Sequence, residues 1–481
     1  MFAALIRSLV LLLLMTAGSL CAAEKPNILF IFADDLAYDC VGAHGNQEVQ
    51  TPHLDDLAKG GVVFSHAYNM GGWHGAVCVA SRTMLNTGRF LWRAKKAEAA
   101  INREYVAEKK MWSQIMEANG YQTFMTGKWH VKAKAESIFQ TAVHVRGGMP
   151  KQTPQGYNRP LGLDDRTWQP WDKKFGGFWE GGKHWSEVVA DDAEDFLQTA
   201  AKSPQPFFMY IAFNAPHDPR QAPREFVERY PLDKISVPQP FIKDYPYEIG
   251  CNRIRDEKLA PFPRTEYAVK VNRQEYYAII THMDEQIGRI LAALKETGQE
   301  KNTYVIFTAD HGLGCGHHGL MGKQNMYDHS VRVPFFITGP GIPSGQRKSA
   351  SIYLQDAMAT SFDLAGIEKP EHVEFRSVMP LVRGDHDQHY ETIYGAYVNF
   401  QRMITSDGYK LIVYPQIGKQ RLFHVAEDPW ELKDLIADPS QQDRIRALTE
   451  KLKQLQREMD DDLALEAPAK APRKKSKKKA A

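Results

Sequence analysis

The amino-acid sequence predicts an α/β fold, with a large and mainly parallel central sheet flanked by helices and a small C-terminal antiparallel sheet with one helix. Three observations predict this fold. Four nearly continuous apolar segments are typical of strands in a sheet that is covered on both faces. Helical patterns lie between these segments, and such strand–helix alternation favours parallel pairing. Beyond residue 384 the pattern changes to short strand-like segments separated by turns, followed by one helix.

The first 23 residues are predicted to be a signal peptide. Arg7 precedes an apolar run over residues 9–15, and small residues follow up to Ala23. The run is too short to span a bilayer comfortably, so we expect cleavage near Ala23, a periplasmic or secreted protein, and no integral membrane span in the mature chain. Cys21 leaves a lipoprotein as the less favoured alternative, because a bulky leucine precedes it.

Polar residues follow each of the four predicted strands of the main domain, residues 24–384. The strands are Asn27–Ala33, Tyr121–Thr126, Phe207–Phe213 and Tyr304–Ala309. The polar residues after them are Asp34 and Asp35, Lys128 and His130, His217, and Asp310 and His311. One such residue alone is more often a turn or cap residue than a ligand. Because ligands of parallel sheets bind beyond the carboxyl ends of the strands, four such ends favour one shared site.

Helices and irregular segments account for the rest of the main domain. Helical spacing predicts helices over Trp112–Asn119, Asp191–Ala201 and Gln274–Leu294. Residues 147–182 and 241–265 show no clear period, and long irregular segments of this kind often form the walls of a binding site.

The C-terminal subdomain is predicted to span residues 385–465. Its expected strands are Tyr390–Tyr397, Gln401–Thr405, Tyr409–Tyr414 and Arg421–His424, and its helix is Gln441–Met459. Residues 466–481 are rich in lysine and lack apolar periodicity, which predicts a basic and disordered tail.

Composition excludes several classes of protein. The chain has 481 residues, of which 43% are hydrophobic and 25% charged, so it has the apolar mass for a large core. Five cysteines are too few for a disulfide scaffold, and the spacing of Cys40, Cys251 and Cys315 does not predict a disulfide. The formal charge is +2, but eight of the cations lie in the leader and the last twelve residues, which leaves −6 for the body. We therefore expect no nucleic-acid partner.

The polar residues at the strand ends fall into two chemical groups. Three carboxylates, from Asp34, Asp35 and Asp310, suit a hard cation such as calcium or magnesium, with His311 as a less usual further ligand. The second group is cationic or hydrogen-bonding and suits a compact anion. It comprises Lys128, His130, His217 and Lys323.

Cys78 lies in the segment GAVCVASRTMLNTGR. A helix starting at about Ser81 would place Cys78 just before its N-terminus, where the helix dipole favours a nucleophile and an anion. Arg82 adds a fixed positive charge one turn on. The alternative is that Cys78 is a small buried hydrophobic residue.

Seven segments, taken in order, resemble the formylglycine-dependent sulfatases, a family of the alkaline-phosphatase-like superfamily. The most specific is Cys78-Val79-Ala80-Ser81-Arg82 with Thr87-Gly88-Arg89. The others are Asp34-Asp35, Thr51-Pro52-His53-Leu54-Asp55, Gly127-Lys128-Trp129-His130, Pro216-His217, Asp310-His311-Gly312 and Lys323. The resemblance extends over most of the chain and implies an exported sulfatase with its catalytic domain at residues 24–384.

The resemblance implies roles for the matched residues. Cys78 resembles the residue that a sulfatase-maturating enzyme oxidises to formylglycine, whose gem-diol attacks sulfur. One divalent cation, usually Ca²⁺ with Mg²⁺ as the alternative, would be held by Asp34, Asp35, Asp310, His311 and the modified residue 78. Arg82 and His130 match residues that hold the diol. Lys128, His217 and Lys323 match residues that bind the sulfate and protonate the leaving oxygen.

One position departs from the usual signature. Ala80 stands where most members of the family have proline. The alanine form resembles the substrates of oxygen-independent bacterial maturation enzymes, so we expect a maturation partner of that anaerobic type.

An exported sulfatase implies a sulfated carbohydrate as substrate. Six residues beside the motifs are candidates for a sugar subsite or, equally, for supports of the site. They are Trp73, His74, His317, His318, Gln324 and Asn325. Two alternatives remain: a phosphonate monoester or phosphodiester hydrolase of the same superfamily, and a non-catalytic glycan-binding relative in which Cys78 is not oxidised.

Overall fold

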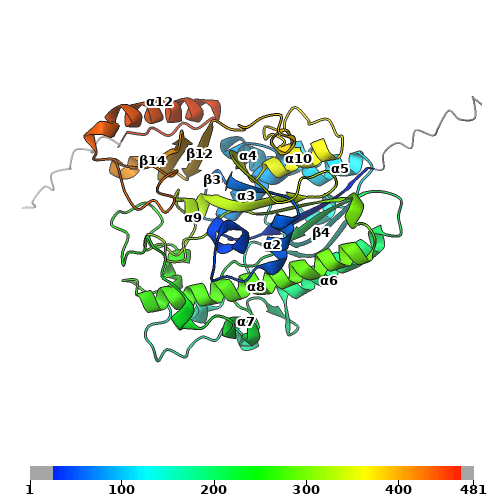
Figure 1. Ribbon diagram of the computed structural model, residues 1–481, viewed down its shortest axis with the longest axis horizontal. Coiled ribbons are helices and arrows are strands. Elements are labelled where there is room, and N and C mark those ends of the chain that lie inside the picture. Colours follow the sequence, from blue (N-terminus) through cyan, green and yellow to red (C-terminus); the bar gives the residue numbers. More distant parts are fainter. Residues whose placement is uncertain (1–24, 467–481) are drawn as a thin grey trace, which may run out of the picture.

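Eight strands form the central sheet of this computed structural model, which describes residues 25–466 (Figure 1). Their spatial order is β11-β2-β10-β9-β1-β8-β4-β5. The strands are β1 (Asn27–Ala33), β2 (Val62–Tyr68), β4 (Gln122–Lys128), β5 (Thr141–Arg146), β8 (Phe207–Ala212), β9 (Thr303–Ala309), β10 (Arg332–Thr338) and β11 (Gln346–Tyr353). All pairings are parallel except those of β10, which is antiparallel to both neighbours. The predicted mainly parallel sheet is therefore confirmed.

The four strands predicted from the sequence, β1, β4, β8 and β9, lie side by side at the centre of the sheet. Every residue of β1 and β8 is buried, which explains their continuous apolar sequences. The other four strands were not predicted. β5 and β11 are edge strands with mixed burial, and β10 carries Pro334 at a register shift, where a strand tolerates proline.

Helices cover both faces of the central sheet (Figure 1). On one face, α2 (Pro52–Lys59), α6 (Trp185–Ala200) and α7 (Arg224–Glu228) pack against the long helix α8 (Glu266–Glu296). On the other face, α4 (Leu91–Ala99), α5 (Trp112–Ala118) and α10 (Asp356–Leu364) pack around α3 (Val77–Thr87). The shorter elements are α9 (Asp328–Val331), α11 (Met379–Arg383) and the hairpin of β6 (Trp179–Glu180) and β7 (Lys183–His184).

Two helices begin earlier than the sequence predicts, because their caps were not recognised. Helix α8 starts at Glu266 rather than Gln274, and the hydroxyl of Thr265 accepts a hydrogen bond from the Ala268 amide. Helix α6 starts at Trp185 rather than Asp191, and the His184 ring accepts one from the Ser186 amide.

The small sheet has the order β15-β14-β13-β12-β3. Its antiparallel strands are β12 (Thr392–Tyr397), β13 (Gln401–Ser406), β14 (Tyr409–Tyr414) and β15 (Lys419–Phe423), and α12 (Gln442–Glu458) packs on it. These elements match the predicted strands and the predicted helix to within two residues at each end. The fifth strand, β3 (Gly71–Gly72), belongs to the segment just before Cys78 and pairs in parallel with β12. The small sheet is therefore bonded directly to the loop that leads into α3.

The chain ends fall largely outside this description. The predicted signal peptide, residues 1–23, and all but the first residue of the predicted tail, residues 466–481, lie outside residues 25–466. Within the described range, none of the helices has both the length and the apolar character needed to cross a membrane. Cys40, Cys78, Cys251 and Cys315 are all free and buried there.

Candidate active site

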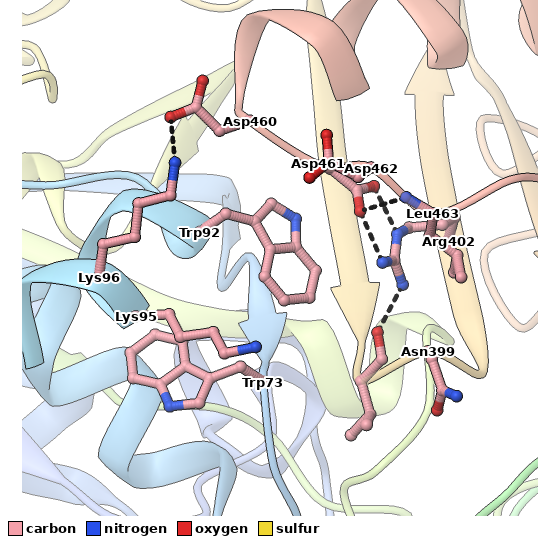
Figure 2. Close-up of a pocket in the computed structure, with 11 residues that line it drawn as sticks. Trp73, Trp92, Lys95, Lys96, Asn399, Arg402, Asp460, Asp461, Asp462 and Leu463 are labelled. Carbon is pink, nitrogen blue, oxygen red and sulfur yellow. Dashed lines mark hydrogen bonds and ion pairs between the residues drawn. The ribbon is translucent and has the colours of Figure 1, made fainter. Parts of the chain in front are cut away.

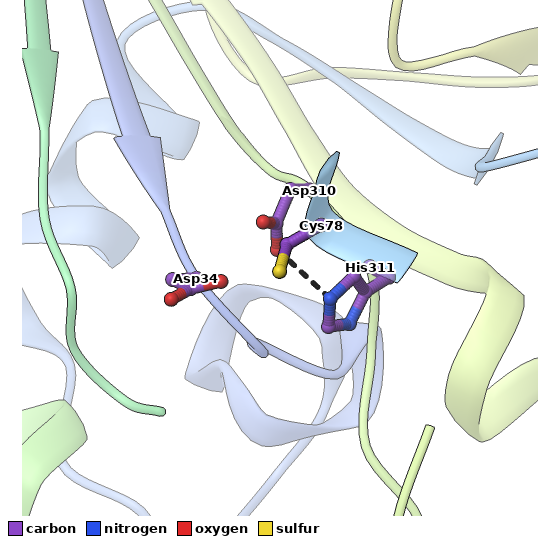
Figure 3. Close-up of side chains that lie close together, drawn as sticks. All are labelled: Asp34, Cys78, Asp310 and His311. Carbon is purple, nitrogen blue, oxygen red and sulfur yellow. Dashed lines mark ion pairs between the residues drawn. The ribbon is translucent and has the colours of Figure 1, made fainter. Parts of the chain in front are cut away.

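The carboxyl ends of the central strands bring the predicted site residues together. Asp34 and Asp35 follow β1, Lys128 ends β4, and Asp310 follows β9, and all four are fully buried. Ligand atoms of Asp34, Cys78, Asp310 and His311 lie within 4.8 Å of one another (Figure 3). A second set of the same compactness joins Asp34 and Asp35 to His217. The shared site predicted from the strand ends therefore exists as a geometric cluster.

Each buried carboxylate of the cluster has a cationic partner. Lys128 Nζ donates to Asp34 Oδ2. Lys323 Nζ lies 2.8 Å from both carboxylate oxygens of Asp35. The Nε atom of Arg82 lies 3.1 Å from Asp310 Oδ2. Three negative and three positive charges thus share one buried volume.

This crowding shifts the acidity of the carboxyl groups in different directions. Burial, together with the nearby Asp310, raises the pKa of Asp34 well above its usual range. Burial raises the pKa of Asp35 to about 6, although Lys323 opposes the shift. Asp310 is buried as well, but His311, Arg82 and Lys128 outweigh the burial and lower its pKa. Two of the three carboxylates therefore carry their charge at a cost that a bound cation would relieve.

The donor atoms of the cluster fit a divalent cation. His311 Nδ1 donates to the Gly312 carbonyl at 2.9 Å, which leaves Nε2 as the lone-pair atom facing the carboxylates. His311 Nε2 and Asp34 Oδ1 are both buried and have no hydrogen-bond partner within the described residues. Buried polar atoms without partners are uncommon in folded proteins. One oxygen and one nitrogen without partners, beside three carboxylates, fit a divalent cation, and the carboxylate oxygens are the ligands that calcium and magnesium prefer.

Cys78 lies in the first turn of α3, and not before the helix as the sequence predicted. Its Sγ atom is 3.1 Å from His130 Nδ1, and the side chain is buried. Burial alone would raise the pKa of the Cys78 thiol. Lys128, His311 and Lys323 outweigh burial and lower this pKa to about 7. The position is therefore one that stabilises negative charge, as expected near a helix N-terminus beside fixed cations.

Arg82 ties three elements of the site together. It lies on α3, one turn after Cys78, and is fully buried. Its Nη1 atom donates to the Lys128 carbonyl at 2.8 Å, and its guanidinium stacks on the Phe32 ring at 4.6 Å. With the bond to Asp310, these contacts fix the ends of β1, β4 and β9 relative to α3.

The two histidines of the site are neutral. Burial lowers the pKa of His130 to about 3, and Lys128 and Arg82 add to the shift. Burial also lowers the pKa of His217 well below its usual value, with further contributions from Lys323 and Lys128. His217 Nδ1 donates to the Asp218 carbonyl at 2.6 Å, so Nε2, 3.9 Å from Asp35 Oδ2, carries the lone pair.

A cavity of 440 Å³ opens above the cluster. It is lined by Gly75, Ala76, Cys78, His130, Gly148, Met149, His217, Ile254, Arg255, Asp256, Lys323 and Gln324. Both irregular segments predicted as walls contribute, one through residues 148–149 and the other through residues 254–256.

The sequence did not single out Arg255, Asp256 or Gly148. Arg255 bridges Asp218 at 3.3 Å and Asp256 at 2.6 Å, and Asp256 in turn accepts a bond from Gln324 Nε2 at 2.7 Å. These residues lie in segments without periodicity. The length and irregularity of such a segment predicted a wall of the site, but no feature of the sequence pointed to an individual residue.

Of the six candidates for a sugar subsite, Gln324 lines this cavity, and His74 and Asn325 are sequence neighbours of lining residues. Gln324 lines it, and its Nε2 atom also donates to the Gly75 carbonyl at 2.9 Å. His74 precedes the lining residue Gly75, and its ring accepts a bond from the Ala76 amide. Asn325 is fully buried, and its Oδ1 atom accepts from the Tyr327 amide at 3.2 Å.

The other three candidates, Trp73, His317 and His318, do not line this cavity. His317 lies 3.4 Å from Asp39 and stacks on Trp430, on the wall of a different cavity. His318 stacks on Tyr327 with 4.0 Å between ring centres and donates to a backbone carbonyl. Trp73 lines a further cavity beside the small sheet. Being close to a motif along the sequence did not bring these three side chains into the cavity above Cys78.

Comparisons with known proteins agree with this geometry. The family profile described as Sulfatase matches residues 26–367, and the profile described as N-sulphoglucosamine sulphohydrolase, C-terminal, matches residues 316–458. An arylsulfatase of Clostridium perfringens is 30% identical over 463 residues, covering 88% of this chain and 92% of that protein. An ulvan-active sulfatase of Formosa agariphila is 28% identical, covering 91% and 80%. A solved structure with bound D-glucosamine-2-N,6-O-disulfate, described as its substrate, has a TM-score of 0.71 and 20% identity and covers 91% of this chain and 99% of that one.

Proposed function

This chain belongs to the sulfatase family and is a sulfuric ester hydrolase, and from that premise we propose that it removes sulfate from sulfated carbohydrates outside the cytoplasm. We further propose that residue 78 acts as formylglycine beside one divalent cation, with calcium as the expected ion. The observation that carries the proposal is the position of Cys78. Its Sγ atom lies within 4.8 Å of the ligand atoms of Asp34, Asp310 and His311, on the wall of the 440 Å³ cavity.

The fixed charges around Cys78 suit the binding of a sulfate ester. Three residues carry positive charge: Lys323 lines the cavity, and Lys128 and Arg82 contact the carboxylates. The neutral His130 and His217 also line the cavity and add hydrogen-bonding groups. Positive groups that are already held in place stabilise charge that develops on the sulfate oxygens, without a cost of reorganisation. These groups therefore bind the anion and orient its sulfur toward residue 78.

His130 is placed to move a proton at residue 78. Its Nδ1 atom is 3.1 Å from the Cys78 side chain, and its low pKa keeps the imidazole neutral and able to accept a proton. Lys323 and His217 both line the cavity and are the candidates for handing a proton to the departing alcohol. Burial alone would lower the pKa of Lys323, but Asp35 and Asp256 outweigh burial and raise it. Of Lys323 and His217, Lys323 is therefore the protonated group.

The modified residue and the metal would supply what the side chains lack. A hydrated aldehyde at position 78 provides a hydroxyl nucleophile, and a divalent cation held by Asp34, Asp35, Asp310 and His311 provides Lewis acidity at the sulfate oxygens. Ala80, in place of the usual proline, supports maturation by the anaerobic type of sulfatase-maturating enzyme.

Three observations support a carbohydrate substrate. The cavity has the volume that a sugar-sized ligand needs. Its walls carry amide, carboxylate and guanidinium groups that suit hydroxyl and acidic substituents. The relative from Formosa agariphila is named for activity on ulvan.

Two measurements test the proposal. Mass spectrometry of the peptide that contains residue 78, from protein made with an anaerobic maturation enzyme, should give the mass of an aldehyde in place of a thiol. The same protein should release sulfate from sulfated oligosaccharides and turn over an aryl sulfate faster than an aryl phosphodiester. Faster turnover of the phosphodiester would favour the phosphonate or phosphodiester hydrolase instead. A fully retained thiol in the native host would favour a glycan-binding relative without catalysis.

A further inference from the structure

A second cavity, of 580 Å³, lies where the small sheet meets α4 (Figure 2). Its walls come from Trp73, from helix α4, from residues 398–402 at the β12–β13 turn, and from the segment after α12. Its aromatic lining residues are Trp73 and Trp92, and its basic lining residues are Lys95, Lys96 and Arg402. None of them lines the cavity above Cys78. The volume is within the range of small-molecule binding sites.

Two indole rings on one side of this cavity face Arg402 and Asn399 on the other (Figure 2). The Trp92 ring is held in place because its Nε1 atom donates to the Tyr394 hydroxyl at 2.8 Å and because the Arg402 guanidinium stacks on it at 4.9 Å. Trp73 is only 7% exposed, and the Nζ atom of Lys95 lies 5.5 Å from the centre of the Trp92 ring. The cavity therefore offers indole surface that is held in place, with a cation beside it, which suits a ligand that has apolar faces and polar or acidic substituents.

Four of the six charged residues that line the cavity form ion pairs. Arg402 Nε is 2.6 Å from Asp461, and Lys96 Nζ is 3.0 Å from Asp460. Of the charged lining residues, Lys95 and Asp462 remain without an ion pair in the described part of the chain, and both are exposed. Because positive and negative charges balance, this surface does not attract polyanions through charge alone. Recognition would depend on ring faces and hydroxyls, with Lys95 available for one acidic substituent.

The second cavity adjoins the first through a short stretch of backbone. Trp73 lines the second cavity, and Gly75, two residues later, lines the cavity above Cys78. Two residues of extended chain span at most about 7 Å. Backbone atoms that line the two cavities are therefore no more than about 7 Å apart, a separation that one oligosaccharide can bridge.

We propose that the Trp73–Trp92 cavity is a second saccharide-binding subsite, which holds sugar units of the glycan at a distance from the sulfate ester being cleaved. The inference rests on the proposed function for its ligand class. It predicts that longer sulfated oligosaccharides bind more tightly than short ones, because additional sugar units reach this subsite.

The test is a binding measurement on Cys78→Ala protein, so that no substrate is consumed. The probes are hexasaccharides and disaccharides prepared from ulvan, carrageenan and heparin, with calorimetry at about 0.5 M NaCl to suppress adsorption to the basic tail. Trp92→Ala and Lys95→Glu are added separately. Lys202→Glu, at an exposed lysine two residues beyond the end of α6, is the matched control. Trp73 is left intact because it is part of the buried core.

We expect at least one hexasaccharide to bind tenfold or more tightly than its disaccharide, and Trp92→Ala to remove that difference. Lys95→Glu should weaken hexasaccharide binding several-fold, and Lys202→Glu should leave it unchanged. If Trp92→Ala does not fold, the effect of Lys95→Glu on hexasaccharide binding tests the subsite alone. Equal affinity in all variants, loss of all binding at high salt, or no binding of any probe would overturn the subsite. A protein that binds hexasaccharides through Trp92 but never releases sulfate would instead contradict the proposed function.

Discussion

The ammonium group of Lys323 lies 2.8 Å from both carboxylate oxygens of Asp35. This contact neutralises one of three carboxylates that are buried together, while Asp34 Oδ1 and His311 Nε2 remain without hydrogen-bond partners in the described chain. The site thus holds three carboxylates that each have a cationic partner and, among them, two ligand atoms without a hydrogen bond. That arrangement makes the stability of the protein depend on what fills the space between them.

Calcium should therefore stabilise the protein measurably. Adding about 1 mM CaCl₂ to EDTA-treated protein should raise the melting temperature by a few degrees, because a ligand that binds only the folded state stabilises it by mass action. Asp34→Asn should reduce the rise, since it removes one of the negative charges that attract the ion. Differential scanning calorimetry with Ca²⁺, Mg²⁺ and EDTA makes the comparison. Identical melting curves in all three would show that the cluster holds no ion.

Cys78→Ala should abolish sulfate release while leaving the fold intact. The substitution removes the side chain that the maturation enzyme would oxidise, so turnover should fall by a factor of about 10³ or more. The melting temperature should change little, because a small side chain replaces a small one. Sulfate release is followed by ion chromatography. Turnover at the wild-type level would mean that residue 78 is not the nucleophile.

Gly148 and Gly147 form a matched pair of substitutions beside His130. A Cβ atom at Gly148 would overlap the His130 ring, whereas one at Gly147 meets no atom within 4 Å. Gly148→Ala should displace the imidazole from residue 78 and lower kcat about tenfold or more, because misplaced catalytic groups lose most of their effect. Gly147→Ala should behave like the wild type. Equal kcat values for the two variants would argue against a proton-transfer role for His130.

His44 should make the protein less stable in acid. Burial lowers its pKa to about 3, with Arg332 and Arg347 adding to the shift, and its ring stacks on Phe336. Because the folded-state pKa is below the unfolded value of 6.5, this contribution is complete above pH 6.5 and is lost as the pH falls toward 3. The loss is about 1.4 kcal/mol for each pH unit in that window.

The substitution His44→Phe tests that pH dependence. It keeps the stacked ring and removes the titrating group, so the variant should lose about 2 kcal/mol less than the wild type between pH 7.5 and pH 5. Urea unfolding at both pH values measures the difference, and His386→Phe, at an exposed histidine, is the control. A variant that loses as much stability as the wild type would contradict the uncharged state of the half-buried His44.

The centre of the sheet and most of the site were predictable from the sequence for one physical reason. Strands covered on both faces must be continuously apolar. Polar residues that directly follow such a strand therefore stand out in the sequence. Asp34, Lys128 and Asp310 were found in this way. The edge strands β5 and β11 were not, because partial exposure gives them mixed sequences.

The residues that shape the mouth of the site were harder to predict. Arg255 and Gly148 come from aperiodic loops, and their positions depend on contacts with His130, Asp218 and Asp256. Trp73 was predicted as a candidate for the sugar subsite because it lies close to Cys78 in the sequence. Its actual surroundings depend on packing against residues 398–402 and 460–463, which no local pattern encodes.

The pairing of β3 with β12 constrains how this protein can diverge. Val398 donates to the Gly72 carbonyl at 2.8 Å, and Ala396 donates to the Met70 carbonyl at 2.9 Å, so main-chain bonds join the C-terminal sheet to the approach to residue 78. A substitution or insertion that reshapes the β12–β13 hairpin would also displace the backbone that leads to residue 78. New specificity and retained turnover therefore have to be acquired together, and exchanging the C-terminal sheet between relatives should fail unless residues 70–78 are exchanged with it.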